Sequence, residues 1–202
     1  MMAKAPPVDK RRQILDAAIH VFARQGFHAC RVSDIADEAG VAYGLVYHYF
    51  NSKDEVLNEL FTERWSLLLA AIEEVDGQAI GAREKLDAVA RFIVDSYRYE
   101  PDLMKVIIVE VTRAANSFGR THLPEIRRAY DMIAKIVADA QRAGTFRKDV
   151  DPEFASMWFY GAIEQLLSGW VFELITGGEA DFDRARKMVV ETICGGLEAP
   201  AG

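Results

Sequence analysis

Apolar side chains recur every three or four positions along almost the whole chain. This spacing places them on one face of successive helices, and no stretch of alternating apolar and polar residues persists long enough to form a strand. The pattern therefore predicts an all-α protein of about nine helices. Only the run 106–109 is ambiguous, because its β-branched residues would also suit a buried strand.

Capping residues and glycines set the expected limits of these helices. Gly40 is expected to end the second helix in the left-handed conformation, and Ser52 and Glu55 to form a capping box at the start of the fourth. Asp151 is the expected cap of the eighth helix and Asp181 of the ninth. The expected helices span about residues 10–25, 32–39, 42–50, 52–76, 83–99, from 101 onward, 123–143, 152–175 and 181–195.

Three regions follow from this order of helices. Residues 1–9 are expected to form a disordered arm, residues 10–53 a three-helix module, and residues 54–202 a larger domain for ligand binding and dimerisation. No apolar run is long enough to cross a bilayer, and the first residues lack the apolar region of a secretion signal, so we expect a cytoplasmic protein. Two cysteines at opposite ends of the chain favour reduced thiols over a disulfide framework or a zinc cluster.

The net charge of −7 argues against nucleic acid as a partner only if the charge is spread evenly, and it is not. Residues 1–53 carry a net charge of +2 and the remainder of the chain carries −9. A mildly basic module on an acidic body can approach phosphate groups, while the body discourages other orientations.

The segment 42–50 crowds aromatic rings around a glycine, and a helical wheel divides its residues into two arcs. Val46 and Phe50 fall on one arc, where they can join a small core. The other arc contains Tyr43, Gly44, Tyr47 and His48. Two short helices joined by a turn, with polar-tipped rings facing outward, are the layout of a helix-turn-helix whose second helix enters the major groove of DNA. The alternative is that these rings only cover the core, which is their commonest use.

Across residues 10–61 the sequence resembles the tetracycline-repressor (TetR) family of bacterial transcription factors. The resemblance rests on "ILDAAIHVFARQGF" and on "VSDIADEAGVAYGLVYHYFNSKDEVL", with its Gly-Val turn, Gly-x-x-Tyr-x-Tyr-Phe helix and following lysine. It implies a DNA-binding regulator without cofactor or metal. Carried over by position, it places Tyr43, Gly44 and Leu45 near base edges, Tyr47, Tyr49 and Lys53 on phosphates, Ser33 near the groove, and His48 on either.

The chain departs from this family at the start of the second helix. Where the family usually has a capping Thr or Ser, this chain has Cys30 and Arg31. Arg31 could replace the usual hydroxyl contact with a charge-assisted bond to phosphate. Alternatively, it is a solvated surface arginine.

The eighth helix is apolar around most of its circumference, so it must be covered on several sides. The ninth helix offers a complementary stripe, and we expect the two to form a four-helix bundle with a second copy of the chain. Such a dimer would present two recognition helices about 34 Å apart to a palindrome. The expected interface residues are Phe159, Ile163, Leu167, Trp170, Val171, Met188, Val189 and Ile193.

Polar residues at positions typical of a core suggest a ligand pocket in the larger domain. They could line a mostly apolar cavity with a few polar anchors, although each could equally be exposed or paired. The expected pocket residues are Tyr97, Glu110, Arg113, Asn116, Phe118, His122, Tyr130, Trp158, Glu164 and Gln165. The order and spacing of residues 107–170 also resemble the fatty-acid-responsive branch of TetR regulators, which implies a long acyl-CoA whose phosphate end meets Arg113 or a neighbouring base.

The sequence thus predicts a homodimeric repressor that a small, largely apolar ligand releases from a palindromic operator. The ligand would shift the population toward a dimer whose recognition helices are wrongly spaced, with the fourth helix as lever. A protein-binding adaptor and an all-α enzyme are the alternatives. The enzyme is disfavoured because the four histidines show no metal-ligand spacing and the chain has no Gly-rich phosphate loop.

Overall fold

The computed structural model describes the backbone of residues 9–112 and 121–198. Side chains are described for residues 9–109 and 121–198. Over this part of the chain the fold is all-α, as predicted, with one isolated β-bridge between Phe146 and Glu198. The described helices are α1 (Lys10–Gln25), α2 (Val32–Glu38), α3 (Tyr43–Tyr49), α4 (Lys53–Asp76), α5 (Ala82–Tyr99), α6 (Pro101–Thr112), α8 (Leu123–Arg142), α9 (Pro152–Val171) and α10 (Glu179–Leu197).

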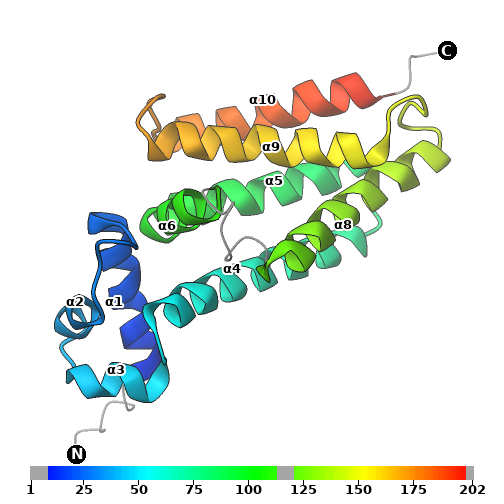
Figure 1. The fold of residues 1–202 in the computed structure, drawn as a ribbon. Helices are drawn as coiled ribbons and strands as arrows, with labels where there is room; N and C mark the ends of the chain where they lie inside the picture. Colours follow the sequence, from blue (N-terminus) through cyan, green and yellow to red (C-terminus); the bar gives the residue numbers. More distant parts are fainter. Residues whose placement is uncertain (1–8, 113–120, 199–202) are drawn as a thin grey trace, which may run out of the picture.

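The helices form a small N-terminal unit and a larger body (Figure 1). Helices α1, α2 and α3 lie together at one end, and α4 runs from this unit along the body. Helices α9 and α10 lie side by side on the opposite side of the body, and α5 packs against α10. The body also reaches the N-terminal unit through α6, which packs directly against α1.

Most helix ends fall where local signals place them. Asp9 caps α1 by accepting the backbone N–H of Arg11 at 3.0 Å, and Gly26 follows the helix with φ 82°. Gly40 has φ 61°, which confirms the predicted left-handed turn between α2 and α3. The ambiguous run 106–109 lies inside α6 and is helical.

The capping box at the start of α4 is only half as predicted. Ser52 Oγ accepts the N–H of Glu55 at 3.2 Å, as expected. The Glu55 carboxylate, however, accepts the backbone N–H of Asn51 at 2.7 Å and its side-chain amide at 2.8 Å, instead of the N–H of Ser52. The box therefore fixes the residue before the cap as well as the cap itself.

Two predicted boundaries near the C-terminus are wrong. Helix α9 ends at Val171 instead of continuing to residue 175, because Glu173 adopts a left-handed φ of 56° and the N–H of Leu174 donates to the carbonyl of Gly169 at 2.8 Å. Asp181 is not the cap of α10 but lies in its first turn, where it accepts the N–H of Gly178 at 3.1 Å. The helix consequently begins at Glu179.

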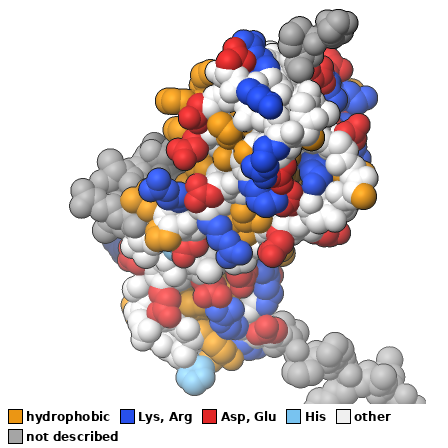
Figure 2. Space-filling view, turned by 90° about the vertical axis from the view of Figure 1, so that its right-hand side faces the viewer, with side chains coloured by type: hydrophobic (Ala, Val, Ile, Leu, Met, Phe, Trp, Pro, Cys, Tyr) orange, Lys and Arg blue, Asp and Glu red, His pale blue; other side chains and the backbone are white. Residues whose placement is uncertain are grey.

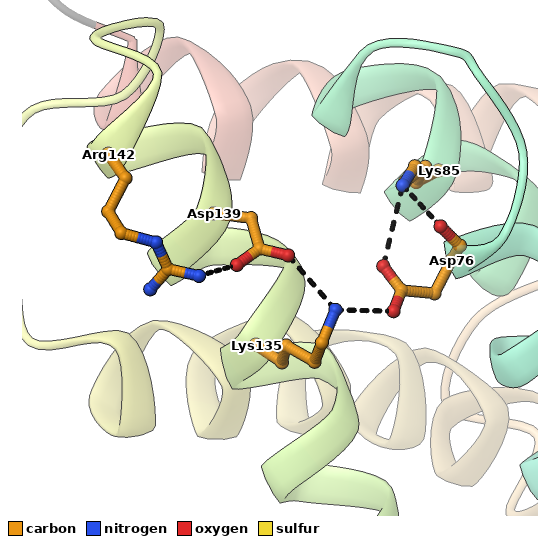
Figure 3. Close-up of polar contacts among 5 residues, drawn as sticks. All are labelled: Asp76, Lys85, Lys135, Asp139 and Arg142. Atoms are coloured by element: carbon orange, nitrogen blue, oxygen red, sulfur yellow. Dashed lines mark hydrogen bonds and ion pairs between the residues drawn. The ribbon is translucent and has the colours of Figure 1, made fainter.

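A chain of ion pairs fastens the far end of α4 to its neighbours (Figure 3). Asp76 accepts hydrogen bonds from Lys85 of α5 at 3.4 Å and from Lys135 of α8 at 2.7 Å. Lys135 also bonds Asp139 at 3.0 Å, and Asp139 in turn pairs with Arg142. Helix α4 is thus held at its C-terminal end, whereas its N-terminal end belongs to the small unit.

No helix in the described ranges is long and apolar enough to cross a membrane.

Candidate nucleic-acid interface and ligand cavity

Helix α3 has one buried and one exposed face. Val46 and the following Phe50 are buried, whereas Tyr43 is 54% and Tyr47 44% exposed. The two tyrosines brace each other, because Tyr43 Oη donates to Tyr47 Oη at 3.2 Å and the ring centroids are 5.2 Å apart. Gly44 has open space where a Cβ would stand, so the backbone here can be approached closely. The predicted division of this helix into two arcs is confirmed.

The other residues predicted on this surface differ in exposure. His48 and Arg31 are exposed, whereas Ser33, Leu45 and Tyr49 are half-buried. The rings of His48 and Tyr49 are in contact, with centroids 5.0 Å apart. Tyr49 also packs against the core, which limits it to presenting an edge outward.

Arg31 does not replace the capping hydroxyl inside the protein. It occupies the N-cap position of α2, but its side chain makes no capping hydrogen bond. Its backbone N–H instead donates to the Asp34 carboxylate at 2.8 Å. Arg31 is exposed, and its contact with a phosphate group stays a prediction.

The side chain of Lys53 makes hydrogen bonds within the chain. Its Nζ donates to the carbonyls of Phe27 at 2.7 Å, His28 at 3.2 Å and Cys30 at 2.9 Å, and it lies 4.6 Å from the centroid of the Phe27 ring. An ammonium group has three protons, and here all three have acceptors. Lys53 therefore fixes the loop between α1 and α2 to the start of α4, and its contact with a phosphate group stays a prediction.

Much of the positive charge of the N-terminal unit is neutralised by acidic residues. Figure 2 shows Lys and Arg side chains interspersed with Asp and Glu over the face that it presents. The ion pairs that involve arginines of α1 include Arg11–Glu59 at 2.6 Å, Arg12–Glu63 at 3.1 Å and Arg24–Glu38 at 3.0 Å. The α3 surface therefore depends on ring hydroxyls, His48 and an approachable backbone more than on a basic patch.

A cavity of about 170 Å³ lies in the body, among α4, α5, α6, α8 and α9. Its lining is predominantly apolar and aromatic, with a few polar groups, as is typical of ligand sites. The lining residues are Arg64, Trp65, Leu68, Phe92, Ile93, Ser96, Met104, Ile107, Ile108, Ile126, Tyr130, Tyr160, Glu164 and Leu167.

Two of the predicted pocket residues, Tyr130 and Glu164, line this cavity. The sequence analysis missed Arg64 and Tyr160. The signal for Arg64 was present, because it interrupts the apolar stripe of α4 between Phe61 and Leu68. A charged residue on a buried stripe needs a partner or a function.

Four other predicted pocket residues lie elsewhere, and their assignment is corrected. Tyr97 stacks on Trp170, with ring centroids 5.6 Å apart, between α5 and α9. His122 is buried against Phe61, with centroids 4.2 Å apart. Trp158, at 59% exposure, and Gln165 face outward from α9. The remaining four predictions, Glu110, Arg113, Asn116 and Phe118, fall outside the described side chains.

Burial controls the ionisation of the polar groups in the cavity. Burial raises the pKa of Glu164, Tyr130 and Tyr160. The charge of Glu164 raises the pKa of the two tyrosines further. Burial lowers the pKa of Arg64, an effect that Glu100 opposes from 3.1 Å away. The cavity therefore favours neutral groups except at Arg64, whose charge is paired.

Large apolar side chains are exposed on α9 and α10, but they differ from the interface residues that were predicted. Phe159, Ile163, Leu167 and Trp170 are at most 5% exposed within the single chain, so they form its core and cannot form an interface. Val171, Val189 and Ile193 are half-buried, and Met188 is exposed. The exposed apolar residues on these two helices are Phe154, Met157, Trp158 and Met188.

Comparison with known proteins identifies the family of this chain. Residues 14–60 match the family described as "Bacterial regulatory proteins, tetR family", and residues 83–193 match "Tetracyclin repressor-like, C-terminal domain". The chain belongs to the TetR family. The chain is therefore a DNA-binding transcriptional regulator, and its N-terminal match covers most of α1, all of α2 and α3, and the start of α4.

Several TetR relatives have names that concern lipids or steroids. The Fatty acid metabolism regulator protein of Bacillus subtilis is 31% identical over 163 residues, covering 80% of this chain and 84% of that protein. The transcriptional repressor KstR2 of Rhodococcus jostii is 26% identical, covering 96% of this chain and 98% of that protein. Among solved structures, FadR from Bacillus subtilis in complex with stearoyl-CoA matches with a TM-score of 0.81 at 26% identity, covering 93% of this chain and 99% of that one.

Proposed function

We propose that this regulator is a homodimeric repressor that binds a palindromic operator through α3 and leaves it when a long-chain acyl-CoA occupies the cavity. The observation that carries the proposal is that one chain has both an exposed recognition surface on α3 and a cavity in its body. Helix α3 exposes Tyr43 and Tyr47, which are not part of the core, and the body holds a predominantly apolar cavity.

The apolar face of α9 and α10 supports the homodimer. Large side chains such as Phe154, Met157, Trp158 and Met188 expose more than half of their surface on adjacent helices. Phe154 and Trp158 lie next to each other, with ring centroids 6.3 Å apart, and clustered exposed apolar side chains are typical of interaction sites. A second copy related by a two-fold axis would cover these side chains with the same set and would place two α3 helices on successive turns of one face of DNA.

The cavity supports a ligand with an apolar chain. Its walls include Leu68, Ile93 and Met104, which offer no hydrogen bond to a polar molecule. The structure of the Bacillus subtilis FadR, which contains stearoyl-CoA, shares the fold over 93% of this chain. A long acyl group therefore suits both the lining and the fold.

An adjoining groove suits the nucleotide end of such a ligand. The groove and the cavity share Arg64, Phe92 and Ser96 in their walls, and the groove also exposes Arg91. Arg64 pairs with Glu100 at 3.1 Å and Arg91 with Asp87 at 3.4 Å. The two arginines would bind the phosphate groups by exchanging these carboxylates for charge-assisted hydrogen bonds to phosphate. An acyl-CoA would then enter beside Arg64, with its chain inside the body.

Helix α6 provides a connection between the cavity and the DNA-binding unit. Met104, Ile107 and Ile108 of α6 line the cavity, and the same helix packs against α1. A ligand that displaces α6 would move α1 and the attached α3, with α4 pivoting about the ion pairs at Asp76. The ligand would thus favour dimers whose α3 helices do not match the operator.

The test is an operator titration at several salt concentrations, followed by addition of hexadecanoyl-CoA. Operator DNA can be taken from the palindrome upstream of the protein's own gene. We expect the logarithm of the affinity to fall with the logarithm of salt by roughly 0.9 per neutralised phosphate, and micromolar acyl-CoA to release the DNA. A flat salt dependence would favour a protein-binding adaptor, and calorimetry without binding heat on ligand-free protein would exclude the acyl-CoA.

A further inference from the structure

The polar groups of the cavity are concentrated on one part of its wall. Tyr130 of α8 and Tyr160 of α9 meet edge to face, with ring centroids 5.3 Å apart, and Glu164 lies one turn after Tyr160 on α9. All three residues line the cavity. Tyr160 and Glu164 are four positions apart on α9, so their side chains leave the helix on the same side, toward the cavity that Tyr130 also lines.

The other polar groups of the lining already have partners. Ser96 Oγ donates to the carbonyl of Phe92 at 2.6 Å, and Trp65 Nε1 donates to the carbonyl of Glu125 at 2.9 Å. Arg64 forms an ion pair with Glu100, which directly follows α5. In the described part of the chain, no hydrogen bond or ion pair involves the side chains of Tyr130, Tyr160 or Glu164. The unused hydrogen-bonding capacity of the cavity is therefore concentrated at these three residues.

An unsubstituted acyl chain would leave this capacity unused. A buried polar group without a partner costs about 1–3 kcal/mol, and methylene groups offer neither donor nor acceptor. A neutral carboxyl group and a tyrosine hydroxyl can each donate and accept a hydrogen bond. The three groups together suit a ligand oxygen, whether hydroxyl or carbonyl.

We propose that the ligand of this cavity is an acyl chain that carries a hydroxyl or keto oxygen, bound by Glu164 together with the hydroxyls of Tyr130 and Tyr160. The proposal rests on the acyl ligand put forward above and adds the chemistry of its chain. A ligand with an amine is less suitable, because Arg64 already places a positive charge on the same cavity wall.

The test compares matched ligands on the same protein. Dissociation constants are measured by calorimetry for hexadecanoyl-CoA and for its 3-hydroxy, 3-keto and 16-hydroxy forms, and then for the corresponding free fatty acids. One additional hydrogen bond inside the cavity should make at least one oxygenated form bind about tenfold more tightly than the plain chain.

Substitutions at position 164 show whether the carboxyl group causes this preference. Glu164→Leu should abolish the preference and strengthen binding of the plain chain, whereas Glu164→Gln, which keeps a donor and an acceptor, should retain it. Gln165→Leu is the matched control on the outward side of α9 and should leave the ratio unchanged. Thermal unfolding of each variant verifies that the fold persists.

The outcomes separate this proposal from the proposed function. A preference among free fatty acids without binding of any CoA ester would support the oxygenated chain and contradict the acyl-CoA. Equal binding of plain and oxygenated chains, or a preference that Glu164→Leu leaves intact, would overturn the inference while keeping the acyl-CoA. Failure of every acyl probe to bind would overturn both.

Discussion

At the scale of single residues, the N-terminal unit separates side chains that hold the fold from side chains that are available to DNA. Val46 and Phe50 fill the core, while Tyr43 and Tyr47 contact little except each other. This division could be predicted from the sequence, because helical geometry alone assigns positions 43, 47 and 50 to their faces.

Tyr47→Ala tests the exposed face. Because Tyr47 is 44% exposed, its loss should leave thermal unfolding nearly unchanged, while operator affinity falls about tenfold to a hundredfold through lost groove contacts. Fluorescence anisotropy with operator DNA measures the affinity. Leu67→Ala, at an exposed position of α4, is the control and should bind as the wild type does. An unchanged affinity in Tyr47→Ala would remove α3 from the interface.

Lys53 shows what a local pattern cannot reveal. A lysine at a helix N-terminus looks like a phosphate ligand, but its three acceptors lie 23 to 26 positions earlier in the chain. Only the packing of the α1–α2 loop against α4 brings these carbonyls to the ammonium group. No pattern of neighbouring residues encodes that contact.

Lys53→Met should therefore destabilise the protein. Losing the hydrogen bonds to the partly buried carbonyls of Phe27 and Cys30 is expected to lower the free energy of unfolding by about 1–3 kcal/mol, measured by urea denaturation. If Lys53 acted mainly on a phosphate, stability would stay constant and the salt slope of operator binding would fall by about one unit.

At the scale of helices, the periodicity of apolar residues predicted nearly every element, and the errors have identifiable causes. Helix α9 ends early because Glu173 takes the left-handed position that glycine usually occupies, and the nearby pair Gly177–Gly178 indicated a later end. The start of α10 was misplaced because an aspartate is favoured both as the N-cap and within the first turn of a helix. Asp181 occupies the first turn.

The faces of α9 could not be assigned from the sequence for a different reason. When a helix is apolar all round, its pattern does not say which face meets its own chain and which meets another. In the structure Phe159 faces inward and its neighbour Trp158 outward. The assignment depends on which other helices pack against α9, and these are α5, α6, α8 and α10.

Substitutions on the two faces of α9 should have opposite consequences. Trp158→Glu combined with Met188→Glu should separate the dimer without loss of folding, because both positions are exposed in the single chain. Sedimentation velocity measures the change from dimer to monomer. Phe159→Ala, in contrast, should lower the free energy of unfolding by about 3–5 kcal/mol. A dimer that survives both glutamates would place the interface elsewhere.

The ion pairs at the end of α4 predict a pH-dependent stability (Figure 3). The hydrogen bond from Lys135 is the largest cause that lowers the pKa of Asp76. A lowered pKa stabilises the fold at neutral pH, and this contribution disappears as pH falls through the folded-state pKa. Lys135→Met should therefore cost about 0.2–1 kcal/mol at pH 7 and less at pH 3, measured by urea denaturation. An equal cost at both pH values would assign the effect to packing.

At the scale of the whole molecule, one helix connects the two surfaces. Helix α6 contributes Met104 and Ile108 to the cavity and packs against α1, while α4 crosses from the N-terminal unit to the anchored end at Asp76. The sequence analysis named only α4 as the lever. Contact between α6 and α1 could not be predicted, because these helices lie far apart in the chain and neither pattern identifies its partner.

The central claim is that occupation of the cavity controls the release of DNA, and filling the cavity from within tests it most directly. Ser96 is the smallest lining residue and points to the variant Ser96→Met, with Ala70→Met on the exposed side of α4 as control. Operator binding is measured by anisotropy while the acyl-CoA form that binds best is added. We expect all three proteins to bind the operator and only the wild type and Ala70→Met to be released. Release of Ser96→Met at the same ligand concentration as the wild type would contradict the account.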